Sequence, residues 1–320
     1  MKIEFPSSCD STRWLQAYRR GGFDLYSPQY GLRTIETWNQ GNKPVHPERD
    51  TDRFLISFAS NIQHSIALYR EYSMKYHLAA VNSAPIESLY KHKPPYILES
   101  FISINADIIK YAKSEHCKSF LLDSGAFTFL NKGSNKAVNW DHYLENYANF
   151  INEHCIEHFF ELDIYKLIGI AQTEQLRNRL ITLTGKQPIP VWHKLLGKEY
   201  YLDLIKEFDY VALGGIAIKD IPKEHYKYFA WFIKKAESQG VDIHLLGWSP
   251  GRKALNLKPH SCDSARWIHD TRHAHLQRFD GHHLKHIRDR DVRLDPRKTN
   301  DIYDYAIQEN VKYQRYLDTL

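Results

Sequence analysis

Three aspartates, Asp123, Asp163 and Asp263, each end a short apolar run of the sequence. Other apolar runs end in His193 and in the glycine pair 214–215. Carboxylates and imidazoles at such positions can act as nucleophiles, proton carriers or hydrogen-bond acceptors. One aspartate after a strand is often only a helix cap. The recurrence of chemical groups at successive run ends indicates a shared site.

The apolar runs alternate with segments of helical period from about residue 118 onward, which is the pattern of βα units in a parallel sheet. The runs span 118–123, 158–163, 188–193, 210–215, 243–248 and 258–263. Because loops at the carboxyl ends of parallel barrel strands carry the active site, we expect the listed end groups to meet on one rim.

Six such strands need two more to complete an eight-stranded barrel, and we expect them at 53–60 and at either 1–5 or 75–81. Residues 24–52 and 82–96 are rich in turn-forming residues and predict long loops. The final segment, from about 300 to 320, is amphipathic and helical. The prediction is an α/β fold, a (β/α)8 TIM barrel with irregular N-terminal loops and a C-terminal helical extension, forming a single domain over 1–320.

The composition is that of a mildly basic globular protein, with 43 Lys and Arg against 38 Asp and Glu. A polyanion partner is compatible with this balance but does not follow from it. The 4 cysteines form no C-x-x-C pair, which excludes an obvious disulfide framework or thiolate zinc site. No apolar run approaches the ~18 residues that span a bilayer, so we expect no membrane association and a cytoplasmic location.

Five short motifs occur in a defined order. They are L-L-D-S-G-A-F at 121–127, E-L-D at 161–163, A-L-G-G-I-A at 212–217, H-L-L-G at 244–247 and S-C-D-S at 261–264. In this order and at these separations they resemble the tRNA-guanine transglycosylase superfamily. The variants D-S-G-A-F, P-V-W-H and C-D-S-x-x-W are most similar to a branch found in phages and genomic islands, which exchanges guanine in DNA for a 7-deazaguanine such as preQ0. The likeness covers 118–267.

The resemblance implies a pentosyltransferase that breaks and remakes an N-glycosidic bond with retention. Asp263 matches the family nucleophile, which holds C1′ of the sugar covalently. Asp123 matches the general acid and base that protonates the departing guanine and later deprotonates the incoming base. Asp123 can serve near neutral pH if burial and nearby negative charge raise its pKa.

The resemblance also implies a base pocket. Asp163 accepts the N1–H and amino donors of guanine, and the amides of Gly214 and Gly215 meet its O6. The carbonyl near Ile216 faces the 7-substituent, and Ser124 and Gly125 belong to the same pocket. His193 departs from the Gln of the tRNA enzymes, and it either bonds the base or contacts phosphate.

The C-x-C-x-x-C…H zinc motif of the tRNA enzymes is missing, so we expect no metal and no cofactor. A histidine-based metal site in the region after Asp263 is the alternative to a charged, solvated surface.

That region, within the extension 268–320, is rich in arginine and lysine. The expected nucleic-acid contacts are Arg266, Arg272, Arg278, Lys285 and Arg288. Interleaved aspartates leave open the alternative of internal ion pairs. Trp267 either stacks on a displaced base or packs in the core.

The heptapeptide at 261–267 has a near copy at 8–14, S-C-D-S-T-R-W. The copy is either a similar local cap or a second carboxylate, Asp10, over the site. The expected partners are DNA, single-stranded or with a flipped-out guanine, the 7-deazaguanine base and, as a further option, a helper protein. The alternatives are the same exchange on tRNA, a hydrolytic DNA glycosylase and a non-catalytic nucleic-acid-binding barrel.

Overall fold

The computed structural model describes residues 74–320 apart from 127, 130–137, 252–255, 269–275 and 288–298. The described residues belong to one compact unit, Ala67–Leu320. The strands expected at 1–5 and 53–60, the loop 24–52 and the heptapeptide copy at 8–14 lie outside the described residues.

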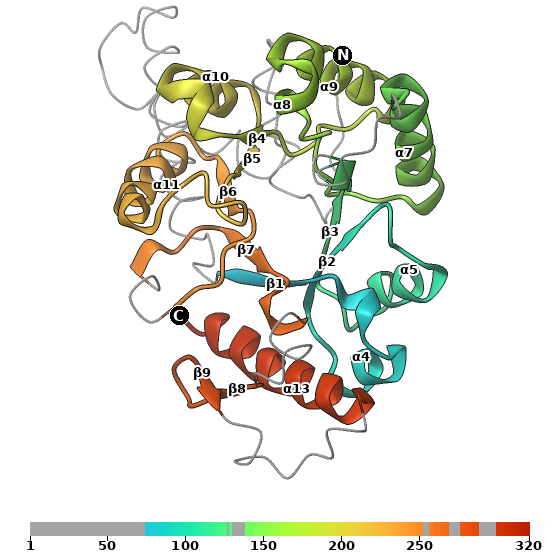
Figure 1. Ribbon diagram of the computed structural model, residues 1–320, viewed down its shortest axis with the longest axis vertical. Helices are drawn as coiled ribbons and strands as arrows, with labels where there is room; N and C mark the ends of the chain where they lie inside the picture. Colours follow the sequence, from blue (N-terminus) through green and yellow to red (C-terminus); the bar gives the residue numbers. More distant parts are fainter. Residues whose placement is uncertain (1–73, 127, 130–137, 252–255, 269–275, 288–298) are drawn as a thin grey trace, which may run out of the picture. The chain divides into compact units, whose positions relative to one another are not determined.

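A parallel sheet of seven strands forms the centre of this unit (Figure 1). Its order is β3-β2-β1-β7-β6-β5-β4. The strands are β1 (Lys75–Ala79), β2 (Tyr96–Ser100), β3 (Ser119–Asp123), β4 (Val191–Trp192), β5 (Tyr210–Leu213), β6 (Asp242–Leu245) and β7 (Ser261–Ser264). The first and last strands of this order, β3 and β4, do not pair with each other, and another segment lies between them.

Residues 159–160 form this segment. Phe159 bridges Leu122 of β3, and Phe160 bridges Ile189 just before β4, both in parallel. Backbone hydrogen bonds support each bridge, from Phe160 N to Leu122 O at 2.9 Å and from Ile189 N to Phe159 O at 2.8 Å. The ring therefore closes with eight parallel positions, and the chain is a (β/α)8 barrel of the TIM type.

Side chains alternate between the barrel interior and the surrounding helices, as the strand period of two requires. On β1, Tyr76 and Leu78 pack in the cluster that includes the helices. Ala79 instead joins a small interior cluster with side chains of the other strands: Leu98, Leu121, Phe160, Ile189, Val191 and Ala212. The barrel is thus a packed core, and ligands can reach only its ends.

Helices follow most strands and cover the ring from outside. They are α4 (Ile86–His92), α5 (Ala106–Ala112), α7 (Trp140–His154), α8 (Tyr165–Ile168), α9 (Ile170–Thr184), α10 (Gly197–Glu207) and α11 (Phe229–Glu237). Short 3-10 turns η1 (Val81–Ser83), η2 (Lys194–Leu196) and η3 (Lys223–Tyr228) link them to the strands. As the alternation in the sequence predicts, α7, α9, α10 and α11 lie between successive apolar runs.

The first part of the described chain corrects one expectation and decides another. Of the two alternatives for an N-terminal strand, 75–81 contains β1. The prediction of a long loop at 82–96 is wrong, because α4 lies within it and β2 begins at its end. The Pro-rich flanks of this segment concealed a short helix whose Leu89 is fully buried.

The extension after β7 contains an antiparallel hairpin, β8 (Leu276–Phe279) and β9 (Leu284–Ile287), and the final helix α13 (Thr299–Leu317). Figure 1 shows α13 beside α4 and β1. Gln314 of α13 donates to the carbonyls of Tyr76 and Tyr96, each at 2.7 Å. The predicted C-terminal helix is therefore part of the barrel wall, where it covers β1 and β2.

Within the described ranges, no helix combines the length and the apolar character that crossing a bilayer requires.

Candidate functional site

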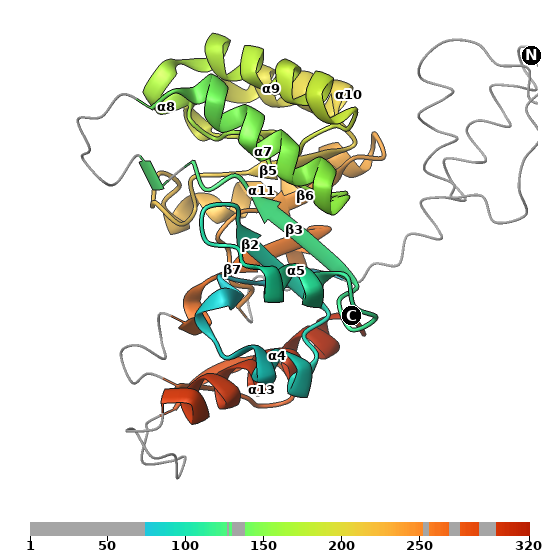
Figure 2. The ribbon, with the colours of Figure 1, turned by 90° about the vertical axis from the view of Figure 1, so that its right-hand side faces the viewer.

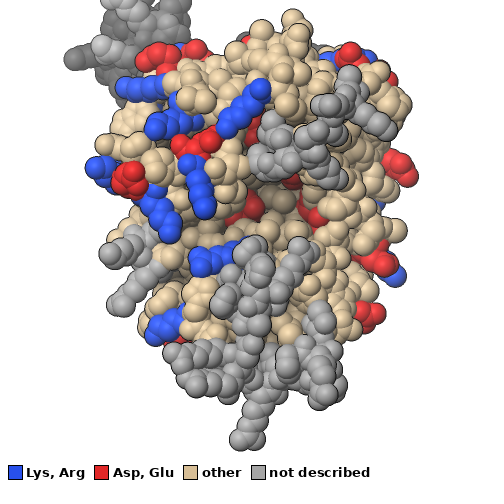
Figure 3. All heavy atoms as spheres, in the orientation of Figure 1, with Lys and Arg blue, Asp and Glu red and all other residues tan. Residues whose placement is uncertain are grey.

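All seven strands are parallel, so their carboxyl ends lie at the same end of the barrel. In Figure 2, which is turned by 90°, the arrowhead of β3 lies on the left, the side that faces the reader in Figure 1. Figure 3 shows this face as a space-filling surface with a hollow at its centre and carboxylate-bearing residues in its walls. The expected rim of the barrel is therefore an open concave face.

Asp263 lies at this end of β7 and is 5% exposed. Its Oδ1 accepts the Gly247 amide at 2.7 Å and faces His244 Nε2 at 3.0 Å. Gly247 has φ +73°, and a Cβ there would lie 2.7 Å from the Ala217 Cβ. The glycine of H-L-L-G thus permits a turn that aims an amide at the predicted nucleophile.

Asp123 lies at the end of β3 on the same face of the barrel and is partly exposed. Its Oδ2 accepts the Gly125 amide at 2.9 Å. Burial raises the pKa of Asp123 to about 7, the bond from Gly125 opposes the shift, and the negative charges of Asp263 and Asp163 add to it. An acid with this pKa can exchange a proton near neutral pH.

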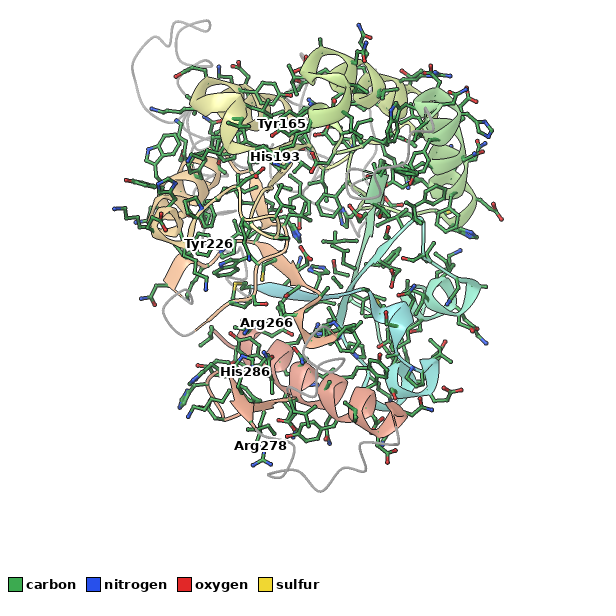
Figure 4. The ribbon with its side chains drawn as sticks, viewed as in Figure 1. Tyr165, His193, Tyr226, Arg266, Arg278 and His286 are labelled. Carbon is green, nitrogen blue, oxygen red and sulfur yellow. The ribbon has the colours of Figure 1, made fainter. Side chains whose placement is uncertain are left out.

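Asp163 and His193 form a pair after residues 159–160 and β4, next to β3 in the ring and across it from Asp263 of β7. The Nε2 of His193 lies 2.8 Å from Oδ1 and 2.9 Å from Oδ2 of Asp163. His193 is 4% exposed, and its Nδ1 is buried without a hydrogen-bond partner in the described part of the chain. Figure 4 shows His193 beside Tyr165, whose ring centre is 4.8 Å away. A buried ring bonded to Asp163 suits contact with a base better than contact with a surface phosphate.

The glycine pair after β5 lies directly against His193. A Cβ on Gly214 would approach His193 Cε1 to 2.7 Å, so only glycine fits under the ring. The expectation that both amides meet a ligand needs correction, because Gly214 N donates to Trp192 O at 2.8 Å as part of the sheet. The sheet leaves only the Gly215 amide for a ligand. The Ile216 carbonyl already accepts the Lys219 amide at 3.1 Å.

Ser124 and Gly125 shape the turn that carries Asp123. Ser124 is 1% exposed, and its hydroxyl lies 3.5 Å from the Ala126 amide. Gly125 has φ +70°, and a Cβ there would lie 2.5 Å from the Ser100 hydroxyl. The Ser124 hydroxyl is buried within its own turn, and the expected base contact of this residue stays a prediction. These two residues position Asp123.

A buried ion pair supports the Asp163 side of the rim, and the sequence did not predict it. Glu161 is 3% exposed and accepts Arg177 Nε at 2.6 Å and the Val191 amide at 2.6 Å. Arg177 Nη2 also donates a hydrogen bond to Tyr200 Oη at 2.7 Å. Burial raises the pKa of Glu161, and Arg177 opposes that shift. Because Glu161 ties its own segment to β4, it sets the spacing between Asp163 and His193.

The predicted nucleic-acid contacts are only partly described: Arg278 and Lys285 are opposite each other in the β8–β9 hairpin, and Arg266 lies against the same hairpin. Arg266 contacts His286 Nε2 at 2.7 Å, and Arg278 donates to Tyr305 Oη at 3.2 Å. Lys285 pairs with Asp280 at 2.7 Å. In Figure 4, Arg266 lies near the barrel mouth and Arg278 points outward at the lower edge. Arg272 and Arg288 lie outside the described residues.

Trp267 and the histidines near it have structural surroundings. Trp267 is 2% exposed and donates from Nε1 to Ala79 O at 3.0 Å, so it packs in the core and does not stack on a base. Among the described residues, no group of three His, Cys, Asp or Glu side chains is arranged to hold a metal ion. His269, His273 and His275 lie outside the described residues.

Two buried residues near the predicted site received no role from the sequence. His244 is fully buried beneath Asp263. Glu99, also fully buried, accepts the amides of Asn82 and Ser100 and the hydroxyl of Ser103. Each is a titratable residue within an otherwise apolar strand, and this pattern could have indicated a buried polar role for both.

Comparison with known proteins adds little beyond the fold. No family model matches the chain, and no curated protein matches it either. Among solved structures, the chain is similar to a putative fructose-1,6-biphosphate aldolase from Coccidioides immitis. That match has a TM-score of 0.48 and 12% sequence identity, and covers 79% of this chain and 94% of that one. No residue role transfers at this level of similarity.

The rim therefore brings together five of the predicted groups. Asp263 and Asp123 lie at the carboxyl ends of β7 and β3, and Asp163, His193 and Gly215 follow residues 159–160, β4 and β5. In this arrangement Asp263 is held by two N–H donors, and the pKa of Asp123 is about 7. The two oxygens of Asp163 can accept hydrogen bonds from a ligand. This arrangement suits covalent substitution at a carbon centre with proton transfer to the leaving group.

Proposed function

We propose that this protein is a DNA-guanine transglycosylase that exchanges guanine in DNA for a 7-deazaguanine. The observation that carries the proposal is the joint placement of Asp263 and Asp123 at one barrel mouth. Asp263 Oδ1 accepts two N–H donors, which stabilise the carboxylate form that attack requires. The pKa of Asp123 is raised to about 7 by burial and by neighbouring carboxylates, Asp263 among them. One group is thus suited to attack and the other to carry a proton.

In the proposed reaction, a carboxylate oxygen of Asp263 bonds to C1′ as the C1′–N9 bond breaks, and the electron pair of that bond goes to the base. Asp123 donates its proton to the departing guanine. The incoming base gives a proton back to Asp123 and displaces Asp263 from C1′. Two inversions retain the configuration of the sugar, and no external oxidant or reductant is needed.

Asp163 and His193 support the binding of a purine-like base. A carboxylate can accept two parallel N–H donors of guanine while it also accepts the His193 bond, because its two oxygens offer about four acceptor sites. The Gly215 amide donates toward the O6 position, where a side chain at residue 214 would collide with His193.

The test is incubation of the protein with preQ0 and either guanine-containing DNA or tRNA, followed by digestion and identification of the nucleosides. We expect 7-deazaguanine in single-stranded DNA and release of one guanine per base incorporated. Incorporation only into tRNA would replace the proposed substrate. Guanine release with abasic sites would indicate a hydrolytic glycosylase, and no release from either polymer would contradict enzymatic exchange.

A further inference from the structure

A chain of buried polar side chains lies inside the barrel beneath Asp263. Tyr210 Oη bonds to Ser261 Oγ, Ser261 Oγ lies 2.5 Å from His244 Nδ1, and His244 Nε2 lies 3.0 Å from Asp263 Oδ1. His244 and Ser261 are fully buried. The chain crosses β5, β6 and β7, which are neighbours in the sheet (Figure 1).

The chemistry of its two ends determines the direction of this chain. An ionised carboxylate only accepts hydrogen bonds, so His244 Nε2 must carry a hydrogen. Nδ1 of the neutral ring then accepts from Ser261, and the Ser261 oxygen accepts from Tyr210. Burial raises the pKa of Tyr210 above its usual range, which keeps the phenol a donor. One neutral tautomer of His244 therefore satisfies every bond in the chain.

The two oxygens of Asp263 consequently differ. Oδ1 receives both N–H donors, from Gly247 at 2.7 Å and from His244 at 3.0 Å. Within the described residues, Oδ2 has no hydrogen-bond partner. A carboxylate held in this way cannot rotate about its Cβ–Cγ bond without losing two charge-assisted bonds.

We propose that His244 is a positioning residue that makes Oδ2 the attacking oxygen of Asp263, with Ser261 and Tyr210 selecting its tautomer. This inference rests on the proposed function. In the forward step the Oδ2–C1′ bond forms, the C1′–N9 bond breaks, and Asp123 protonates the departing base. Oδ1 becomes the carbonyl oxygen of the ester and keeps its two donors. When the second base displaces the ester, negative charge returns to the carboxylate, and the His244 bond strengthens.

The experiment measures the covalent adduct directly. A labelled guanine-containing oligonucleotide is mixed with excess enzyme, the reaction is stopped at timed intervals, and the adduct is separated by denaturing gel electrophoresis. We expect His244→Leu to slow adduct formation by about 10- to 100-fold, the worth of one hydrogen bond to a charged group, and to change the KM for DNA by less than about 3-fold.

Two further variants separate positioning from folding. His244→Gln keeps an N–H donor at nearly the same reach and should recover the rate to within about 10-fold of wild type. His77→Gln is the matched control, because His77 is also fully buried in the barrel but bonds Ser119 and the Cys262 carbonyl. It should lower the melting temperature about as much as His244→Leu yet leave the adduct rate within about 3-fold of wild type.

The tautomer is measured without activity, from the ¹⁵N chemical shifts of His244 near pH 7. We expect hydrogen on Nε2 and none on Nδ1 in the wild type, and a mixture of tautomers in Ser261→Ala. An adduct rate unchanged in His244→Leu, an equal loss in His77→Gln, or a hydrogen on Nδ1 in the wild type would each overturn the role of His244. If the wild type itself forms no adduct with any nucleic acid, the proposed function fails first.

Discussion

Two of the histidine–aspartate pairs, His193–Asp163 and His244–Asp263, lie at the carboxyl ends of the barrel strands and are built differently. In the pair after β4, His193 Nε2 straddles both oxygens of Asp163 at 2.8 and 2.9 Å, and its Nδ1 has no partner among the described residues. In the pair of β6 and β7, His244 Nε2 bonds one oxygen of Asp263, and its Nδ1 is tied to Ser261. The first pair leaves its imidazole available, and the second leaves a carboxylate oxygen available.

This difference separates binding from bond formation. A pair with an unsatisfied buried nitrogen gains when a ligand supplies the missing hydrogen bond. In the other pair both nitrogens of His244 are hydrogen-bonded. His244 therefore holds Oδ1 of Asp263 in place, and Oδ2 is the oxygen proposed to attack. We infer that the Asp163 side recognises the base and the Asp263 side reacts with the sugar.

The largest effect should follow removal of the predicted nucleophile. Asp263→Ala should lower base exchange by at least about 10³-fold, because it removes the group proposed to form the covalent bond. The adduct gel and exchange of labelled guanine measure this, with melting temperature as the control for folding. Retained exchange would mean that the two pairs do not divide the chemistry as inferred.

Loss of the buried cation beneath the other pair should mainly change stability. Arg177→Met should reduce the free energy of unfolding by about 3–5 kcal/mol, because it leaves Glu161 as an unpaired buried carboxylate. Urea unfolding measures the loss. The double variant Glu161→Gln/Arg177→Met should regain much of it. A loss below about 1 kcal/mol in the single variant would contradict the role of Glu161 as a charged anchor.

Asp123→Asn should slow adduct formation by about 10²-fold, the usual contribution of one general acid. Base binding should change little, because the amide keeps the shape of the side chain. Wild-type adduct formation should also fall above pH 7, about tenfold per unit, as Asp123 loses its proton through a pKa of about 7. A wild-type-like rate in the variant would exclude Asp123 as the acid.

A leucine in place of His193 should change different kinetic constants from a leucine in place of His244. His193→Leu should raise the KM for the free 7-deazaguanine by about 10-fold and, at saturating DNA, change the rate of adduct formation by less than about 3-fold. Steady-state kinetics with varied base concentration measure the split. If His193→Leu and His244→Leu gave the same pattern, the distinction between the pairs would be wrong.

The smallest effect concerns stability against pH. The folded-state pKa of Asp123 is raised, so protonation of this group favours folding at low pH, and the contribution is lost as pH rises through about 7. Asp123→Asn never ionises and should therefore gain a few degrees of melting temperature over the wild type between pH 5 and 8. Asp203→Asn, at a side chain that is 70% exposed, is the control.

The sequence predicted where the chemical groups at the strand ends lie better than it predicted which atoms they bond to. Asp123, Asp163, His193 and Asp263 all lie on one face because each follows an apolar run, and run ends are a local property of the chain. The hydrogen bond of Gly214 to the sheet and the burial of Ser124 and Trp267 depend on neighbours distant in the sequence. Local pattern contains no such information: it predicted a ligand contact for the Gly214 amide, which bonds within the sheet, and left open whether Trp267 packs in the core. The helix at 86–92 was missed because seven residues between prolines carry little periodicity.

By itself, the sequence determined the alternation of strands and helices, the barrel class and the order of the chemical groups around the ring, because apolar period and parallel topology follow from residue type. Only the tertiary structure decided which histidine nitrogen faces which carboxylate oxygen, and which glycine amide the sheet consumes. These choices depend on strand register and on the closure of the ring through residues 159–160. Register is a property of paired strands, and no single stretch of sequence specifies it.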